Sequence, residues 1–214
     1  MGLELHALSG SPFSWKVWLS LEHKQAPYTL VLRSADQGEL RTPEFLALNP
    51  RGKVPVIADG GFVLYESSAI VEYLHEAFDG EPLWPRDVRE RAIARRLAAE
   101  AADHLYPPTR RLVTELSGRS RSDEAVIEEA KRALSKELDL VSSRIRLPFV
   151  MGTSATAVDY ATYPLVAIVV HRLARRAPER GFEEIVPSKV RRWMEHVEAL
   201  PFYARTYPPH WRTS

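Results

Sequence analysis

Cysteine is absent from this chain of 214 residues. Its absence excludes a disulfide framework, a thiolate metal site and a cysteine nucleophile, so any thiol chemistry must use the thiol of a ligand. The seven histidines show no H-x-x-x-H spacing, and we expect no metal site. Excess charge is also absent, because 29 lysines and arginines face 28 aspartates and glutamates. No bulk field therefore recruits nucleic acid or an anionic membrane.

Long apolar runs are missing as well. No run is long enough to span a bilayer, and the first residues lack the basic segment and apolar core of a signal peptide. We therefore expect a cytoplasmic protein. The composition that is present, with 45% hydrophobic and 27% charged residues, is ordinary for a globular chain. The length suits one large domain or two small ones.

The most informative stretch covers residues 52–74, GKVPVIADGGFVLYESSAIVEYL. Val56 to Ala58 is β-branched and apolar, Asp59-Gly60-Gly61 predicts a turn, and Phe62 to Tyr65 returns as a second strand. Glu66-Ser67-Ser68 then opens a run with apolar residues at helical spacing. The pattern predicts a strand, a hairpin turn, a strand and a helix.

Two places in this stretch could hold a ligand. A cis peptide costs little only before proline, and a cis Val54–Pro55 bond would turn the backbone N–H and C=O of Val54 toward an extended peptide. At the helix start near Glu66 and Ser67, unpaired N–H groups attract a carboxylate. The plainer interpretation is a hairpin packed on a helix with Ser67 only a cap, and this stretch alone favours it.

The segments before this stretch predict a β-α-β unit. Leu3 to Leu8 reads as a strand, Ser14 is expected to cap a helix that ends near Lys24, and Tyr28 to Leu32 is the next strand. The two strands should be parallel, with a right-handed crossover. A short helix is expected to start at Thr42-Pro43-Glu44. The order βαβαββα thus fills residues 1–78, and a proline-rich linker follows at residues 79–86.

Residues 87–214 predict an all-α domain that ends in an aromatic tail. Tyr106-Pro107-Pro108 should kink or break its first helix, because proline removes a backbone donor. Residues 123–143 read as one long amphipathic helix. Thr156 and Asp159 have capping-box spacing, with Asp in place of the usual Glu or Gln, and the helix that they start is apolar almost all round. Such a helix is typical of the buried centre of a domain.

Three motifs carry a resemblance to a known family. Lys53-Val54-Pro55, then Glu66-Ser67 at a helix start, and Ser11-Pro12-Phe13 after the first strand resemble the glutathione site of the glutathione transferases, most closely the serine-type, tau-like classes. The two-part plan, with a capped buried helix at 156–159, extends the resemblance over nearly the whole chain. It implies an α/β thioredoxin-like domain that binds glutathione, followed by an all-α domain that contributes the electrophile pocket.

The resemblance implies that the hydroxyl of Ser11 hydrogen-bonds the glutathione thiolate, which attacks the electrophile. Ser9 and Ser14 compete for this role, and a turn serine satisfied by local backbone is the plainer alternative. No tyrosine precedes Tyr28, so a tyrosine-type site has no candidate.

The other glutathione contacts follow from the groups that the tripeptide displays. Its γ-glutamyl carboxylate needs donors from Ser67, its ammonium needs Glu66, and its cysteinyl amide needs the backbone of Val54. Its glycyl carboxylate needs a cation. Lys53 is in place for it, and Arg41 falls where the tau-like pattern has a lysine, although a solvated surface charge is an equal alternative for Arg41.

The electrophile pocket is expected to be apolar and to lie where domains meet. Phe13 is assigned both to glutathione and to this pocket. The pocket candidates, each of which also suits ordinary core or tail packing, are Phe13, Tyr106, Leu112, Tyr207 and Trp211.

The function implied is conjugation of the glutathione thiolate to a hydrophobic electrophile, with glutathione as co-substrate and detoxification as the role. One alternative is a glutathione-dependent isomerase or dehalogenase, although zeta-like isomerases have a second serine and a cysteine where this chain has Pro12 and Phe13. Another is a non-catalytic binding or scaffold protein. The resemblance also implies a homodimer, for which Arg89 to Arg96 and the acids Glu72 and Glu76 offer charged faces. Because acids interrupt the arginines, a nucleic-acid partner is not expected.

Overall fold

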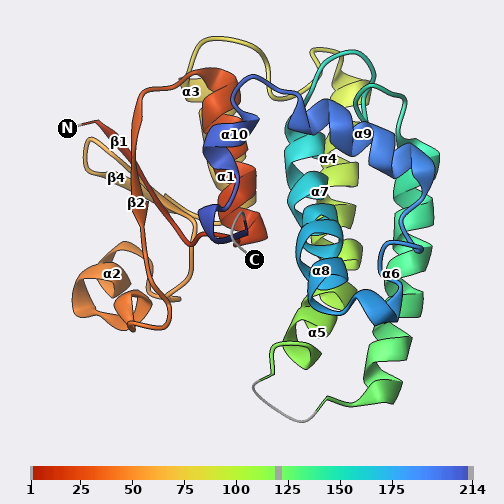
Figure 1. Ribbon diagram of the computed structural model, residues 1–214. Coiled ribbons are helices and arrows are strands. Elements are labelled where there is room, and N and C mark those ends of the chain that lie inside the picture. The colour runs from red at the N-terminus through yellow and green to blue at the C-terminus, as the bar shows by residue number, and fades with distance from the viewer. Residues whose placement is uncertain (1, 119–121, 212–214) are drawn as a thin grey trace. The chain divides into compact units, whose positions relative to one another are not determined.

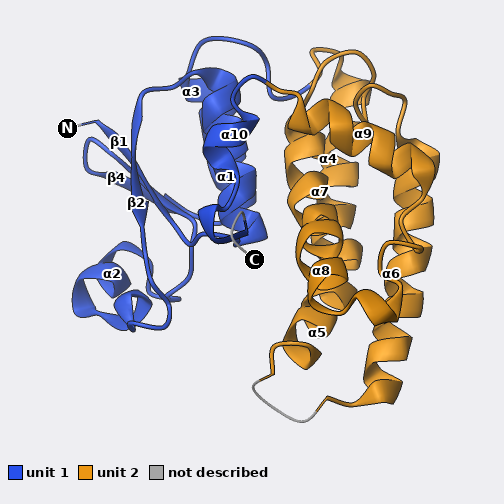
Figure 2. Ribbon diagram, viewed as in Figure 1, with its two compact units in different colours: residues 1–84, 201–214 blue, residues 85–200 orange. Residues whose placement is uncertain are grey.

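The computed structural model describes residues 2–118 and 122–211, so the end of the predicted aromatic tail lies outside the described residues (Figure 1). The chain divides into two compact units, Met1–Trp84 with Pro201–Ser214 and Pro85–Leu200 (Figure 2). The tail thus belongs with unit 1, whereas the sequence grouped it with the helices.

Unit 1 is built on a four-stranded mixed sheet in the order β2-β1-β3-β4. β1 pairs with β2 in parallel and with β3 in antiparallel, and β3 and β4 form an antiparallel hairpin. Gly60 and Gly61 turn the hairpin at φ values of 55° and 97°, which residues other than glycine adopt with difficulty. The strands are β1 (Leu3–Ala7), β2 (Tyr28–Leu32), β3 (Val56–Asp59) and β4 (Phe62–Tyr65).

Helices cover both faces of this sheet, which confirms the predicted thioredoxin-like fold. α1 and α3 lie on one face and α2 lies on the other (Figure 1). Leu5 of β1, Leu19 of α1 and Ile70 of α3 are fully buried in the core between them. The helices of unit 1 are α1 (Pro12–Lys24), α2 (Pro43–Leu48), α3 (Ser67–Ala77) and the short α10 (Tyr203–Thr206).

The expected cap of α1 was wrong by three residues. The cap is Ser11, whose extended backbone (φ −72°, ψ 121°) precedes Pro12 and whose Oγ accepts from Ser14 N at 3.4 Å. Proline suits the first helical position because its fixed φ matches the helix and its missing N–H would be unpaired there. Ser14 instead lies buried in the first turn, where its Oγ accepts from Leu8 N at 3.4 Å.

The tail packs on α1 through aromatic rings (Figure 1). Trp15 of α1 donates from Nε1 to Thr206 Oγ1 at 2.9 Å and meets the rings of Tyr207 and Trp211 edge-on, with centroids 6.0 and 5.6 Å away. Trp15 is only 2% exposed. These contacts explain why residues 201–211 belong to unit 1.

The regular elements described in unit 2 are helices, joined by loops, one of which contains an isolated β-bridge between Phe149 and Gly152 (Figure 1). The helix does not break at Tyr106: it stays helical into α5, but a π-helical segment, Ala101–Leu105, ends where Tyr106 N donates to Ala101 O. Pro107 and Pro108 follow without N–H groups, so the longer hydrogen-bond ring forms just before them. The helices are α4 (Val88–Glu100), α5 (Tyr106–Glu115), α6 (Glu124–Arg144), α7 (Ala157–Ala167), α8 (Ala174–Arg176) and α9 (Ser188–Glu198).

Asp159 holds the centre of unit 2 together. Every residue of α7 is buried, and the predicted capping box forms at its start. Asp159 Oδ2 accepts from Thr156 N at 2.8 Å and from Thr156 Oγ1 at 3.0 Å. Asp159 Oδ1 accepts from Val150 N at 2.9 Å and from Trp193 Nε1 at 2.8 Å. One buried carboxylate therefore ties α7 to α9 and to the loop before α7.

Candidate functional site

The register of the sheet brings the predicted glutathione contacts to one end of unit 1. His6 of β1 stands opposite Val56 of β3, and Val56 stands opposite Tyr65 of β4. Because β3 runs antiparallel to both neighbours, the chain leaves β1, enters β3 and leaves β4 at the same end. The Ser-Pro-Phe loop, the Val-Pro dipeptide and the start of α3 therefore gather there. Sites where loops cluster at strand ends are common ligand positions in α/β folds.

The three serines after β1 differ in their surroundings. Ser14 is 1% exposed, and Ser9 Oγ already lies 2.9 Å from His210 Nδ1. Ser11 is partly exposed at the N-terminus of α1. Its Oγ accepts from Ser14 N, so its own hydrogen is free of that bond and available to a ligand. This geometry favours Ser11 over its two neighbours.

Gly10 lets the C-terminal turn approach this loop closely. Gly10 has φ +78°, and a Cβ built on it would lie 3.0 Å from His210 Cε1 and 3.5 Å from Trp211 Nε1. Any larger residue at position 10 would push the turn at Pro209–Trp211 away from the loop that carries Ser11.

Glu66 sets the start of α3 in an unusual backbone conformation. Its φ is 72° and its ψ is 107°, a region that residues other than glycine rarely occupy. Such strain persists where the surrounding structure enforces it, often at ligand sites. Ser67, the first residue of α3, is 9% exposed, and the Glu66 side chain lies out in solvent, 3.9 Å from Arg51. The start of α3 at Ser67 can thus donate hydrogen bonds to an anion, and the adjacent carboxylate of Glu66 can bind an ammonium group.

The Val-Pro dipeptide adopts the predicted conformation, because the Val54–Pro55 bond is cis. The loop before it is held by Asn49, a residue that the sequence interpretation did not assign to the site. Asn49 is 3% exposed, donates from Nδ2 to Lys53 O at 2.7 Å and accepts from Arg51 N at 3.0 Å. Its only sequence signal was its place in a turn, Asn49-Pro50-Arg51-Gly52.

Two cations meet at this loop. A Cβ on Gly52 would lie 2.7 Å from Arg41 Nη1, so the guanidinium of Arg41 rests against Gly52, one residue before Lys53. Both side chains are exposed. Gly52 has φ +58°, a conformation that favours glycine. That these two cations receive a ligand carboxylate stays a prediction.

The electrophile candidates are divided between the two units. Phe13 and Tyr207 are partly exposed in unit 1, and Tyr106 is partly exposed at the start of α5 in unit 2. Trp211 is 3% exposed and Leu112 is fully buried, so packing already covers both of them. The pocket that these residues would form stays a prediction.

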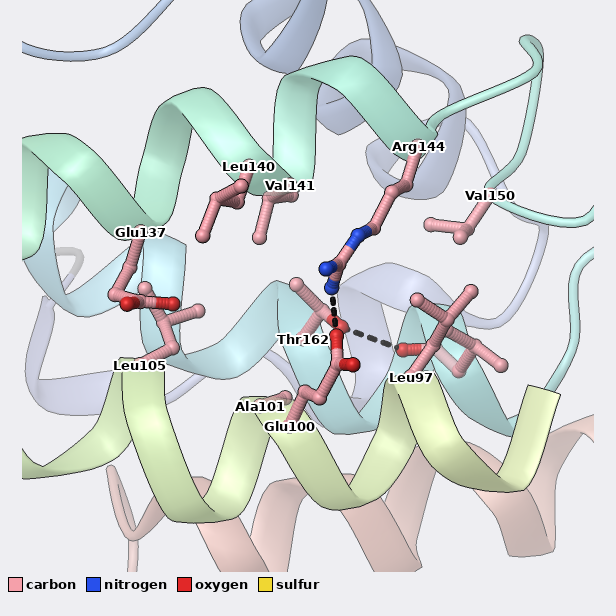
Figure 3. Close-up of a pocket in the computed structure, with 11 residues that line it drawn as sticks. Leu97, Glu100, Ala101, Leu105, Glu137, Leu140, Val141, Arg144, Val150 and Thr162 are labelled. Carbon is pink, nitrogen blue, oxygen red and sulfur yellow. Dashed lines mark hydrogen bonds and ion pairs between the residues drawn. The ribbon is translucent and has the colours of Figure 1, made fainter. Parts of the chain in front are cut away.

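A cavity inside unit 2 contains none of the predicted residues. It lies between α4 with the π segment, α6 and α7, and an ion pair of Glu100 with Arg144 crosses it (Figure 3). Its volume of ≈ 30 Å³ accommodates about one or two water molecules. It is therefore too small for a hydrophobic substrate.

Among residues 2–118 and 122–211, no three His, Asp or Glu side chains are grouped to hold a metal ion. In the same residues, no helix combines the length and apolar character needed to cross a membrane.

Glutathione S-transferases are the known proteins that this chain resembles. Residues 10–77 match the model of the glutathione S-transferase N-terminal domain. Glutathione S-transferase 3 of Zea mays is 29% identical over 211 residues, which cover 95% of this chain and 92% of that protein. Glutathione S-transferase 1 of Dianthus caryophyllus is 36% identical, but the match spans only 49% of this chain and 48% of that protein. A glutathione S-transferase structure from the Antarctic clam Laternula elliptica superposes with a TM-score of 0.80 at 27% identity, covering 100% of this chain and 95% of that one. The chain is thus similar to glutathione S-transferases along nearly its whole length, and residues 10–77 match the N-terminal domain of that family.

Proposed function

We propose that this protein is a glutathione transferase that joins the thiolate of glutathione to a hydrophobic electrophile. The observation that carries the proposal is the convergence of the Ser11 loop, the Val54–Pro55 dipeptide and the start of α3 at one end of the sheet. The sulfur forms a bond to an electrophilic carbon, and the leaving group departs with the bonding electrons. The thiol proton is lost to solvent before the attack.

Ser11 supplies the hydrogen bond that makes the thiolate available. A free thiol has a pKa of about 8.5, and lowering it by two units requires roughly 2.7 kcal/mol of preference for the thiolate. A hydrogen bond to a charged acceptor contributes about 1.5–3 kcal/mol, and a helix N-terminus adds about 0.3–1 kcal/mol. Ser11 at the N-terminus of α1 is therefore sufficient.

The remaining contacts divide glutathione among three segments. Ser67 and the first N–H groups of α3 receive the γ-glutamyl carboxylate, and Glu66 receives the ammonium. Val54 pairs its backbone with the cysteinyl amide. Lys53 and Arg41 receive the glycyl carboxylate. Phe13 borders the thiol and the electrophile in this arrangement.

The test is a conjugation assay with an aryl halide, run together with a measurement of glutathione affinity on the same protein. Glutathione binding with saturable turnover supports the proposal. Binding without turnover of a panel of aryl halides, epoxides and enones would point to the binding or scaffold alternative. Turnover by isomerisation or dehalogenation alone would point to the alternative enzyme class. Failure to bind glutathione would contradict both enzymatic functions and would leave only a scaffold protein without a glutathione site.

A further inference from the structure

A buried lysine that none of the roles above uses reaches the start of α3. Lys16 lies on α1 and is 5% exposed, and its Nζ donates to Ser68 Oγ at 2.9 Å. Ser68 is the second residue of α3, directly after Ser67. The ammonium group therefore lies at the first turn of the helix whose N–H groups would receive the γ-glutamyl carboxylate.

This position is unfavourable for a cation in the unliganded protein. Burial removes water from the ammonium, and the positive end of the helix dipole repels it. Burial is the main cause that lowers the pKa of Lys16 to about 8, against a smaller opposing effect of Glu72 on α3. A carboxylate bound at the start of α3 would reverse both penalties, because it supplies an anion to the ammonium and to the helix end together.

We propose that Lys16 is a positioning residue for the γ-glutamyl carboxylate of glutathione. It fixes the first turn of α3 through Ser68 and places a positive charge behind the N–H groups that contact the carboxylate. The inference rests on the proposed function, since it names a further determinant of the same site. The simpler role, a structural tie between α1 and α3 through Ser68 and Glu72, makes a different prediction in the experiment below.

The test compares two ligands whose thiols cannot ionise. One is S-methylglutathione, and the other is its analogue in which γ-aminobutyrate replaces the γ-glutamyl residue, so that the α-carboxylate is missing and the amine is retained. Calorimetry on Lys16→Met should show S-methylglutathione weakened about 3- to 30-fold and the analogue almost unchanged. Lys24→Met is the matched control, because Lys24 is equally buried at the other end of α1. It should keep the wild-type preference for S-methylglutathione.

A pH series gives a second readout that a structural tie would not move. Above pH 8 the wild-type ammonium loses its proton, so the affinity for S-methylglutathione should fall relative to that of Lys16→Arg, which stays charged. The amine of the ligand titrates in both proteins, so the ratio of the two affinities isolates residue 16. Ser68→Ala should reduce the preference between the ligands by a smaller factor than Lys16→Met, and it serves if Lys16→Met does not fold.

The outcomes separate the two proposals. Equal weakening of both ligands in Lys16→Met and in Ser68→Ala would show a structural tie and overturn the inference, while the proposed function would stand. An unchanged preference in both variants would overturn it as well. If the wild-type protein binds neither ligand, the proposed function fails and the inference fails with it.

Discussion

The hydroxyl of Ser11 is the residue-scale feature on which the proposed chemistry depends. In Ser11→Ala we expect the pKa of the bound glutathione thiol to rise, because the hydrogen bond to the thiolate is lost. The turnover rate at neutral pH should fall about 10- to 100-fold, as for a charged hydrogen bond of about 1.5–3 kcal/mol, while glutathione affinity changes little. The thiolate absorbance of the bound tripeptide against pH measures the shift.

Ser9→Ala is the matched control for this prediction, since Ser9 Oγ contacts His210 instead. It should leave the pKa of the bound thiol near its wild-type value. A shift in Ser9→Ala without one in Ser11→Ala would mean that the roles of these two serines are exchanged.

His6 makes the stability of unit 1 depend on pH. Its Nδ1 lies 3.0 Å from Arg33 Nη2, and it must accept there because a guanidinium has only donors. Burial, and then the charge of Arg33, lower the pKa of His6. The unfolded chain therefore binds a proton at His6 more readily than the folded protein does. The contribution of neutral His6 to stability is fully present above the unfolded pKa of about 6.5 and is lost as the pH falls below it.

We therefore expect wild-type protein to lose more stability between pH 7.5 and 5 than His6→Gln does in urea unfolding. His23 also has a pKa lowered mainly by burial. His23→Gln should therefore also reduce the loss of stability between pH 7.5 and 5, independently of His6→Gln. Parallel stability curves for the wild type and His6→Gln would show that the pKa of His6 is not shifted by folding.

Site residues that sit in local motifs could be found from the sequence, and those that depend on packing could not. Val54–Pro55 and the helix start at Glu66 are defined by neighbours in the chain. Lys16 meets Ser68 across 52 positions, and only the packing of α1 on α3 reveals the pair. The cap of α1 was misplaced because Ser11 and Ser14 both suit a helix start, and the decisive feature was the extended backbone before Pro12.

At the scale of elements, Asp159 should stabilise unit 2 more than any exposed cap does. Asp159→Ala leaves the buried donors of Thr156, Val150 and Trp193 without an acceptor. We therefore expect the free energy of unfolding, measured by chemical denaturation, to fall by about 3–5 kcal/mol. Asp123→Ala is the comparison, since Asp123 caps α6 at an exposed site by accepting from Ala125 N and Val126 N. Asp123→Ala should lower the free energy of unfolding by only about 0.5–2 kcal/mol. Equal losses would show that the network around Asp159 adds nothing to an ordinary cap.

Helix and strand positions followed from periodicity, whereas the partner of the tail did not. The strands of the sheet and the long helix at Glu124–Arg144 lie where apolar spacing and capping residues predict them. The tail carries aromatic residues without a period, so the sequence contains no sign that Trp15 is their neighbour. The hydrogen bond from Trp15 to Thr206 beside these rings joins residues 191 positions apart, a distance in sequence that no local pattern spans.

At the scale of the whole molecule we predict a two-fold dimer, with unit 1 of one chain against unit 2 of the other. Such an interface must be self-complementary. Exposed ion pairs between the arginines at 89–96 of one chain and acids such as Glu76 of the other would contribute only about 0–1 kcal/mol each, so an apolar contact is also needed. Two exposed apolar side chains are our candidates for this contact. Phe62 is 48% exposed on β4, the edge strand that precedes the acidic α3 in sequence, and Ile93 on α4 is 36% exposed.

Sedimentation at micromolar concentration and moderate salt should therefore give about twice the chain mass of 24.3 kDa. Phe62→Glu should shift the protein to monomer, because it places a charge in the expected apolar contact. Leu32→Glu is the control, since Leu32 is equally exposed but lies on β2, the opposite edge of the sheet, and it should leave the dimer intact. A wild-type monomer would contradict the prediction, and dissociation by Leu32→Glu alone would place the interface on the β2 edge instead.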